Sequence, residues 1–197
     1  EIVDQILTIQ RDTGLVVTNV VYMGQGEPLL NYDEVIKSIK MLNTDLEIGM
    51  RRITISTSGI IPQIYKLGDE NRQLTLALSL HAPDHELRQQ LIPIEKKYHI
   101  QDIIKSLHFL TEKTGRRVTI EYVLIDNIND TADHAKQVVS LLRGLNCNIN
   151  LIPYNSLNDK KYKSPSANKI DDFKSILEKT GKKVTVRLER GADIMAA

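Results

Sequence analysis

Apolar positions along the chain follow two alternating patterns. Segments with an apolar residue every three or four positions predict helices, and short continuous runs of apolar, β-branched residues predict buried strands. The predicted helices cover residues 1–13, 33–43, 62–67, a turn from residue 84, 100–113, 132–142 and 168–180. The predicted strands cover residues 16–23, 53–56, 74–80, 118–125, 147–152 and 184–188.

Helices and strands alternate almost without exception, which indicates parallel strands joined by right-handed crossovers. Because the predicted strands are apolar throughout, we expect both faces of the sheet to be covered. Three α/β architectures fit this order of elements: a doubly wound sheet, a complete barrel and an incomplete barrel. In all of them, ligands bind at the edge where the strands end.

Polar residues follow five of the predicted strands. These strand ends read Gly24-Gln25-Gly26-Glu27-Pro28, Ser56-Thr57-Ser58-Gly59, Ser79-Leu80-His81, Asp126-Asn127 with Asn129-Asp130 just beyond, and Pro153-Tyr154-Asn155. Every one of them is able to hydrogen bond, so this edge is where the chemistry of the protein is expected.

The loop after the first predicted strand combines glycine with an acid. Gly24 and Gly26 let a ligand approach the backbone closely, and Glu27 is suited to accept hydrogen bonds from an ammonium group. The alternative is a tight turn with a solvated glutamate, and the spacing does not separate the two. Leu29 stands where a dinucleotide-binding motif requires its third glycine, which argues against NAD.

The other strand ends also allow two interpretations each. Ser56 and Ser79 suit a ribose or a carboxylate, although serine equally favours turns. His81 is either a proton donor or a structural histidine, and Asn155 either pairs with an adenine edge or caps a loop. No catalytic triad, paired carboxylate or H-x-x-x-H metal motif stands out, so no catalytic residue and no metal ligand is predicted within the chain.

Composition narrows the class of protein. The 197 residues, 41% apolar and 26% charged, suit one globular domain with a sizeable core. A net charge of +1 lacks the electrostatic signature of a protein that grips nucleic acid by itself. The single cysteine, Cys147, excludes a disulfide framework and a cysteine-ligated zinc or iron–sulfur site. With no signal segment and no apolar run of membrane-spanning length, we expect a cytoplasmic protein without membrane contact.

Basic residues gather at three places. Arg51-Arg52 and Arg116-Arg117 each precede a predicted strand, so they are expected at the edge opposite the ligand site, as solvated or paired charges. The third group follows the fifth strand and consists of Lys160, Lys161, Tyr162 and Lys163. Lysines interleaved with an aromatic ring suit contact with an RNA backbone and a stacked base. The alternative is a solubilising loop.

An ordered set of motifs resembles one known family. The motifs are Met-Gly-Gln-Gly-Glu-Pro-Leu-Leu-Asn (23–31), Ser-Thr-Ser-Gly-Ile-Ile-Pro (56–62), Leu-Ser-Leu-His-Ala-Pro (78–83), Glu-Tyr-Val-Leu-Ile-Asp (121–126), Asn-Asp (129–130), Asn-Leu-Ile-Pro-Tyr-Asn (150–155) and Arg-Gly-Ala-Asp-Ile-Met-Ala-Ala (190–197). Together they resemble the dual-specificity RNA adenine-C2 methyltransferases of the radical S-adenosylmethionine (SAM) class. The resemblance extends over essentially the whole chain.

The resemblance implies a partial (β/α)6 barrel and a SAM site at the strand ends. It implies that Gly26 and Glu27 contact the amino acid part of SAM. The other SAM-site residues that it implies are Ser56, Ser79, Leu80, His81 and Asn155. Related enzymes that methylate adenine C8 carry Ala-Leu-Ala in place of Pro28-Leu29-Leu30 and tend to carry Arg in place of Pro153, which favours the C2 branch.

The implied chemistry methylates a protein cysteine with one SAM and uses a 4Fe–4S cluster to split a second SAM into a radical. The implied substrates are large-subunit ribosomal RNA and tRNA, and the implied reductant is a flavodoxin or a ferredoxin. The family's cluster-binding cysteines would precede residue 1, and its methyl-carrying cysteine would follow Ala196-Ala197. Gln25, Ala192 and Met195 also depart from the residues that are common in the family.

These departures shape the expected organisation. Residues 1–197 are expected to form one radical SAM barrel that lacks the first strand, the cluster loop, the RNA-binding domain and the cysteine tail. On its own this chain is expected to be inactive, to bind SAM weakly and to be a monomer, with a dimer through the uncovered sheet edge as the alternative. The competing functions are another radical SAM enzyme, such as the C8 methyltransferase or an activase, and a non-catalytic nucleotide-binding module.

Overall fold

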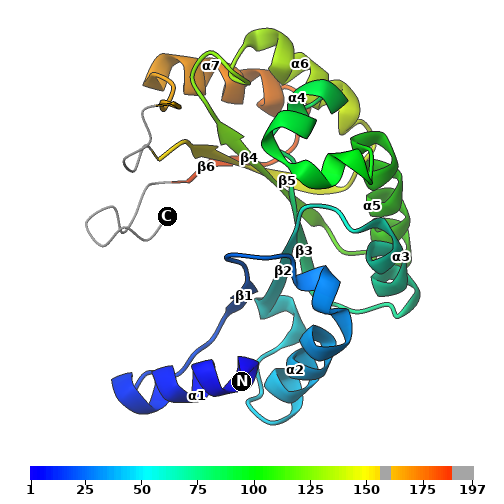
Figure 1. The fold of residues 1–197 in the computed structure, drawn as a ribbon, viewed down its shortest axis with the longest axis vertical. Coiled ribbons are helices and arrows are strands. Elements are labelled where there is room, and N and C mark those ends of the chain that lie inside the picture. The colour runs from blue at the N-terminus through cyan, green and yellow to red at the C-terminus, as the bar shows by residue number, and fades with distance from the viewer. Residues whose placement is uncertain (156–160, 188–197) are drawn as a thin grey trace.

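The computed structural model describes residues 1–155 and 161–187. Within this part of the chain, one sheet holds six parallel strands in chain order. They are β1 (Val20–Tyr22), β2 (Ile53–Thr57), β3 (Thr75–Ser79), β4 (Val118–Leu124), β5 (Cys147–Pro153) and β6 (Val184–Val186). The sheet curves into an open arc (Figure 1). Because a doubly wound sheet reverses its strand order and this sheet does not, the fold is the incomplete barrel.

Helices line the outer side of the arc (Figure 1). They are α1 (Ile2–Thr13), α2 (Tyr32–Thr44), α3 (Ile61–Asp69), α4 (His85–Leu91), α5 (Ile100–Thr114), α6 (Ala132–Leu141) and α7 (Ala167–Glu178), with short 3-10 helices η1 (Pro28–Asn31), η2 (Met50–Arg52) and η3 (Pro93–Lys96). The predicted end of α5 at Gly115 is confirmed, because Gly115 caps the helix in the left-handed conformation at φ 64°. Among the described residues, no helix is long and apolar enough to cross a membrane.

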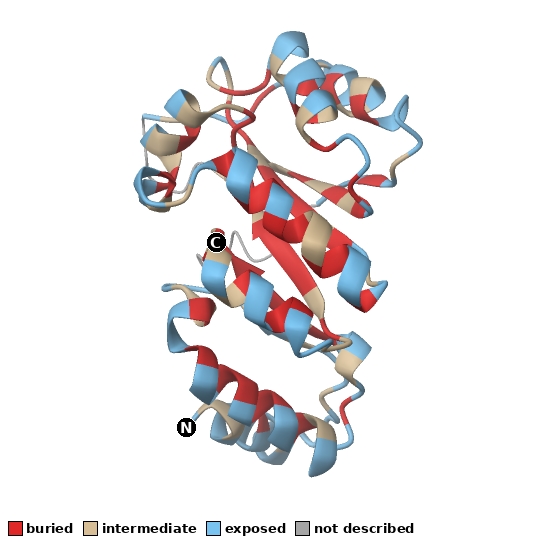
Figure 2. Ribbon diagram, turned by 90° about the vertical axis from the view of Figure 1, so that its right-hand side faces the viewer, coloured by how far each residue is buried: buried red, intermediate tan, exposed pale blue. Residues whose placement is uncertain are grey.

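The two faces of the sheet differ in polarity. Ile53, Ile55 and Ile120 point outward and are fully buried beneath the helices, and these strands and the inward-facing sides of the helices form the buried layer in Figure 2. Residues of opposite parity, such as Thr54 and Glu121, face the concave side. The expectation that both faces of the sheet are covered is therefore wrong for the described residues. In the described part of the chain, helices cover only the convex face (Figure 1), so polar side chains are tolerated on the concave one.

The first strand differs most from its prediction. Residues 16–23 were expected to form one buried strand, but β1 contains only Val20–Tyr22. Val16 is 80% exposed, and Val21 is 53% exposed. Val21 is in register with Thr54 and therefore faces the concave side, which the described helices do not cover. Within the described chain β1 also pairs with β2 alone, so its residues lack the second neighbouring strand that β3 and β4 have. An apolar run predicts a strand here but not its burial.

Candidate functional site

The loop after β1 is shaped by two glycines with positive φ. Gly24 has φ 133° and Gly26 has φ 109°, a backbone conformation that other residues rarely adopt. Space is open where a Cβ would lie at either position, so conformation rather than crowding calls for glycine. The loop lines a shallow pocket of about 220 Å³ together with Tyr22, Met23, Glu27, Pro28, Asn31 and Val35.

Glu27 joins this loop to the next one. Its Oε1 accepts a hydrogen bond from the Leu29 N–H (3.0 Å), which caps η1. Its Oε2 accepts from both the N–H (2.7 Å) and the Oγ–H (2.8 Å) of Ser58, in the loop after β2. The interpretation of Glu27 as a solvated turn residue is therefore wrong. A carboxylate offers about four acceptor positions, so three protein donors leave room for a ligand donor.

Arg88, on α4, is hydrogen-bonded to the loops after β2 and β3. Its Nη2 donates to the carbonyls of Ser58 (2.7 Å) and Ser79 (2.9 Å). Its Nε donates to the Leu80 carbonyl (3.0 Å). These bonds fix two consecutive turns of the candidate site through one fully buried guanidinium.

Glu95, on η3, balances the charge of Arg88. Its Oε2 lies 2.5 Å from Nη1 of Arg88, and both side chains are fully buried. This pair is not evident in the sequence, since an arginine and a glutamate seven positions apart on separate helices resemble ordinary surface charges. A pair of this kind is costly to break, because removing one partner leaves the other buried and uncompensated.

His81 sits at the end of β3 with a left-handed backbone, at φ 57°. The Val123 N–H donates to its Nδ1 (3.1 Å), so the proton of the neutral ring is on Nε2. Burial first, and then the charge of Arg88, lower the pKa of His81 to about 4. His81 is therefore a neutral ring that offers one N–H, and it also has a structural role between β3 and β4.

Asn129 supports the unusual backbone of His81. Its Nδ2 donates to the carbonyls of His81 (2.8 Å) and Val123 (2.6 Å), and its Oδ1 accepts from the Ile125 N–H (2.7 Å). The side chain is completely buried. Asn129 thus joins the ends of β3 and β4. From the sequence, Asn129 was identifiable only as a polar residue near a strand end.

The other predicted cofactor contacts lie at the same edge of the sheet. Ser56 and Ser79 both point to the concave face, where Ser79 is in register with Glu121. Leu80 is fully buried, and its N–H donates to the Glu121 carbonyl (2.9 Å). Asn155 follows β5 and is half-buried. Contact of these residues with a cofactor stays a prediction, and for Leu80 the backbone groups already have protein partners.

The polar residues after β4 serve a structural purpose. Nζ of Lys169, on α7, donates to Asp126 (2.7 Å), Asn127 (2.9 Å) and Asp130 (3.0 Å). This cluster fastens α7 to the turn that follows β4. The polar residues at the end of β4 therefore bind a lysine of the protein itself.

Three residues of the predicted RNA-contact group lie within the described chain. The ammonium of Lys161 is 4.8 Å from the ring centroid of Tyr162, and this ring packs edge-on against Tyr154 at 5.7 Å. Lys163 is exposed, and its carbonyl accepts from the Asp126 N–H (2.9 Å). Lys160 lies outside the described residues. The aromatic residue is thus beside the end of β5, next to the candidate site.

The arginine pairs lie where the sequence predicted. Arg51-Arg52 immediately precedes β2 and Arg116-Arg117 precedes β4, at the edge where the parallel strands begin. Arg117 donates to the side chain of Asn148 (3.0 Å), so one of these charges has a protein partner. Cys147 starts β5 at this same edge.

Comparison with known proteins identifies the class. The model of the Radical SAM superfamily matches residues 1–142. The chain therefore belongs to the radical SAM superfamily. A solved radical SAM methyltransferase from Sphaerobacter thermophilus superposes with a TM-score of 0.92 at 42% identity, over 100% of this chain and 58% of that one. A domain of a pyruvate-formate lyase-activating enzyme from Bacteroides vulgatus, at 19% identity and a TM-score of 0.66, covers 87% of this chain and all of its own length; it shares the fold alone.

Curated relatives show which members of the superfamily this chain is similar to. The chain is 51% identical to a protein of Alkaliphilus oremlandii and 46% identical to one of Clostridium tetani, over its full length in both cases. Both are named as probable dual-specificity RNA methyltransferases RlmN. The resemblance expected from the motifs is confirmed. The chain spans 58% and 57% of the lengths of these relatives.

Proposed function

We propose that this chain is the SAM-binding barrel of a methyltransferase that modifies carbon 2 of an adenine in ribosomal RNA and tRNA. The observation that carries the proposal is 51% identity, across the whole chain, to a relative named as a dual-specificity RNA methyltransferase. The fold alone would not separate this activity from that of an activating enzyme, since a domain of one shares the same barrel.

The residues at the strand ends suit SAM. The ammonium and carboxylate of its amino acid part need an acceptor and donors, which Glu27 and the backbone near Gly26 provide. The Ser56 and Ser79 hydroxyls face the concave side, where a ribose would hydrogen bond. The neutral His81 offers an N–H without adding a positive charge next to the sulfonium. Asn155 is suited to the adenine edge. When bound, SAM supplies the methyl group.

The chain does not provide ligands for a 4Fe–4S cluster. Its single cysteine, Cys147, is buried at the start of β5, at the edge opposite the candidate site. Burial raises the pKa of this thiol, which opposes the thiolate form that a metal requires. The role that we assign to these residues is therefore to bind and orient SAM and RNA.

Two prolines support carbon 2 over carbon 8 as the methylated position. Pro28 begins η1 directly after Glu27, and Pro153 ends β5 in register with Leu124. The C8 enzymes that the motifs resemble carry other residues at these positions. Both prolines lie at the edge of the sheet where SAM and the adenine would meet, so they are placed to influence which carbon is reached.

RNA is proposed to reach the site past Tyr162. Its ring offers a stacking surface, and Lys163 offers a charge to the backbone. The net charge of +1 means that this contact supplies only part of the RNA affinity. A flavodoxin or ferredoxin is the reductant we propose for the complete reaction, and the cytoplasm is the compartment.

A chimera tests the proposal. This chain would replace the matching segment of the Alkaliphilus oremlandii relative, in a host that lacks its own enzyme, and nucleoside mass spectrometry would quantify methyladenosines in both RNA classes. We expect 2-methyladenosine in ribosomal RNA and tRNA. 8-Methyladenosine would support the C8 reaction instead. No new methyladenosine from a soluble, cluster-loaded chimera would support another radical SAM chemistry or a non-catalytic module.

A further inference from the structure

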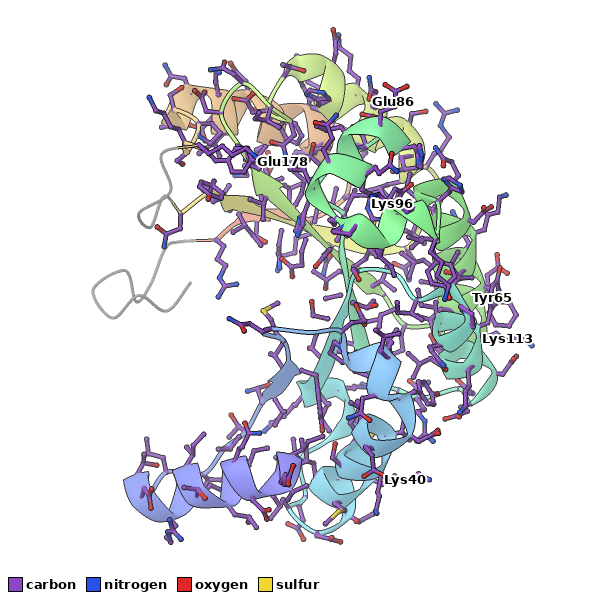
Figure 3. All side chains as sticks on the ribbon, in the orientation of Figure 1. Lys40, Tyr65, Glu86, Lys96, Lys113 and Glu178 are labelled. Carbon is purple, nitrogen blue, oxygen red and sulfur yellow. The ribbon has the colours of Figure 1, made fainter. Side chains whose placement is uncertain are left out.

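Three potential metal ligands outside the predicted SAM-contact residues lie close together. His85 begins α4, Glu95 lies on η3, and His99 immediately precedes α5. Nδ1 of His85 is 3.0 Å from Oε1 of Glu95 and 2.9 Å from Nδ1 of His99. Nδ1 of His99 is 3.9 Å from the same Oε1. Glu86 and Lys96, labelled in Figure 3, mark this region of α4 and η3.

Hydrogen bonding satisfies this arrangement only if the Nδ1–H of His85 is shared between Oε1 of Glu95 and Nδ1 of His99. A histidine ring nitrogen offers either one proton or one lone pair. Nδ1 of His85 faces both Oε1 of Glu95 and Nδ1 of His99, and it is able to make only one full-strength hydrogen bond. If both rings were cationic, two N–H groups would point at each other across 2.9 Å. The close approach of two ring nitrogens is better explained when each presents a lone pair to a shared cation.

The spacing of the three atoms suits such a cation. With separations of 2.9, 3.0 and 3.9 Å, a point equidistant from the three atoms lies about 2 Å from each. This is the distance at which zinc binds imidazole nitrogen and carboxylate oxygen, and a rotation of the exposed His99 ring would reduce the wide angle between it and Glu95 toward the tetrahedral value. The side chains of His85 and His99 are 36% and 53% exposed, so an ion is able to enter from solvent and keep a water ligand. We propose that His85, Glu95 and His99 bind a divalent transition-metal ion, with Zn²⁺ as the best match.

The carboxylate of this site is fixed before any ion arrives. Glu95 is fully buried, and its Oε2 pairs with Arg88. Its Oε1 also accepts from the Ile100 N–H (2.8 Å). Such hydrogen bonds to a ligating carboxylate orient it toward the metal. The positive charge of Arg88 opposes the ion, so the affinity is expected to be lower than that of a site with an unpaired glutamate.

The site would connect the metal to the SAM-binding edge. The ion would bind together the start of α4, η3 and the residue before α5. Glu95 then links it to Arg88, whose guanidinium holds the carbonyls of Ser58 and Ser79. Metal binding is therefore expected to stabilise the loops after β2 and β3, although it takes no part in the proposed methyl transfer.

The test uses the tag-free chain after treatment with a chelator. Calorimetric titration with ZnCl₂ is expected to give a single ion per chain and a raised melting temperature. His85→Ala and His99→Ala should each weaken binding roughly tenfold or more and lose most of the thermal shift. The matched control is His134→Ala, a histidine on α6 that contacts Thr131; it should bind as the parent does. Because His99 is a largely exposed side chain, its variant is expected to keep the fold, which far-UV circular dichroism checks.

Two results would overturn the proposal. One is zinc binding by the parent chain that is no tighter than binding by the folded His85→Ala/His99→Ala double variant. The other is a thiolate charge-transfer band in the spectrum of the chain loaded with Co²⁺. Co²⁺ bound to nitrogen and oxygen should show visible bands without it. A thiolate band would move the ion to Cys147. Neither readout depends on methyltransferase activity, so a failed methylation assay would leave this test intact.

Discussion

The carboxylate of Glu27 and the backbone and side chain of Ser58 form a two-pronged hydrogen bond that joins the loops after β1 and β2. Both donors of Ser58 bond to the same oxygen, at 2.7 and 2.8 Å. The Ser58 carbonyl is in turn bound by Arg88 (2.7 Å). Ser58 is therefore held on both sides, and the shape of the candidate site depends on two charged residues from different elements.

Glu27→Gln is expected to lower both stability and SAM affinity. Glutamine keeps one acceptor oxygen but turns the other group into a donor, which then faces either the Ser58 or the Leu29 N–H. An unsatisfied, partly buried donor costs about 1–3 kcal/mol of unfolding free energy, measurable by urea denaturation. Glu34→Gln, at an exposed position on α2, is the control and should change little. Equal stability of the two variants would contradict this role of Glu27.

Arg88→Met should be among the most destabilising substitutions at the site. It leaves the Glu95 carboxylate buried without its partner, at a cost of about 3–5 kcal/mol. Arg88→Met/Glu95→Leu should lose less than the sum of the two single variants, because the uncompensated charge is gone. The measurement is a double-mutant cycle by denaturant unfolding with chelator present. Arg11→Met, at a side chain 75% exposed, should stay within about 0.5 kcal/mol of the parent.

Acidification should weaken the fold through His81. Its pKa is about 4 in the folded protein, against about 6.5 in an unfolded chain. Between these values the unfolded chain binds more protons, so stability falls as the pH falls. The contribution is complete above about pH 6.5 and is worth at most about 3 kcal/mol. Unfolding free energies from about pH 7 to 4.5 should decline less steeply in His81→Gln, whereas His134→Gln should follow the parent.

Gly59→Ala should destabilise the loop after β2 for two reasons. Gly59 has φ 113°, and an added Cβ would lie 2.5 Å from Cδ1 of Ile103 on α5. Strain and overpacking together should cost about 1–3 kcal/mol. Ile103→Val in the same chain should recover only the steric part. Gly49→Ala, where space is open, is the control, and similar melting temperatures for both alanine variants would refute the argument.

The loop after β5 should contribute to RNA binding in the chimera. Tyr162→Ala removes a stacking surface and should weaken tRNA affinity by about 1–3 kcal/mol. Lys163→Ala should reduce the slope of log affinity against log salt by about 1. Fluorescence anisotropy at several salt concentrations measures both. Lys40→Ala, on α2 far from this loop (Figure 3), serves as the reference. Unchanged affinity in Tyr162→Ala would favour the solubilising-loop interpretation.

The sequence was informative where local chemistry decides the structure. Gly115 ends α5 as predicted because a helix that stops in the left-handed conformation favours glycine. The polar strand ends were located because parallel strands bring them to one edge. The ion pair of Arg88 and Glu95 was missed, since its burial is created by the packing of α4 and η3 against the sheet. The exposure of Val21 was missed for the same reason: burial depends on which strands and helices lie alongside.

The sheet order, identical to the chain order, has a consequence for how the molecule opens. Each strand pairs with the strands that precede and follow it in the sequence. Local unfolding is therefore able to proceed from either edge of the sheet, one strand and its helix at a time. Within the described residues, β1 is three residues long and has one partner strand, so it should exchange its amide hydrogens fastest, and β6 should follow. β3 and β4, the two central strands and the farthest from both edges, should exchange slowest. The Ser79–His81 turn, which follows β3 and is hydrogen-bonded to β4, would then keep its conformation while the Gly24–Glu27 loop opens and closes.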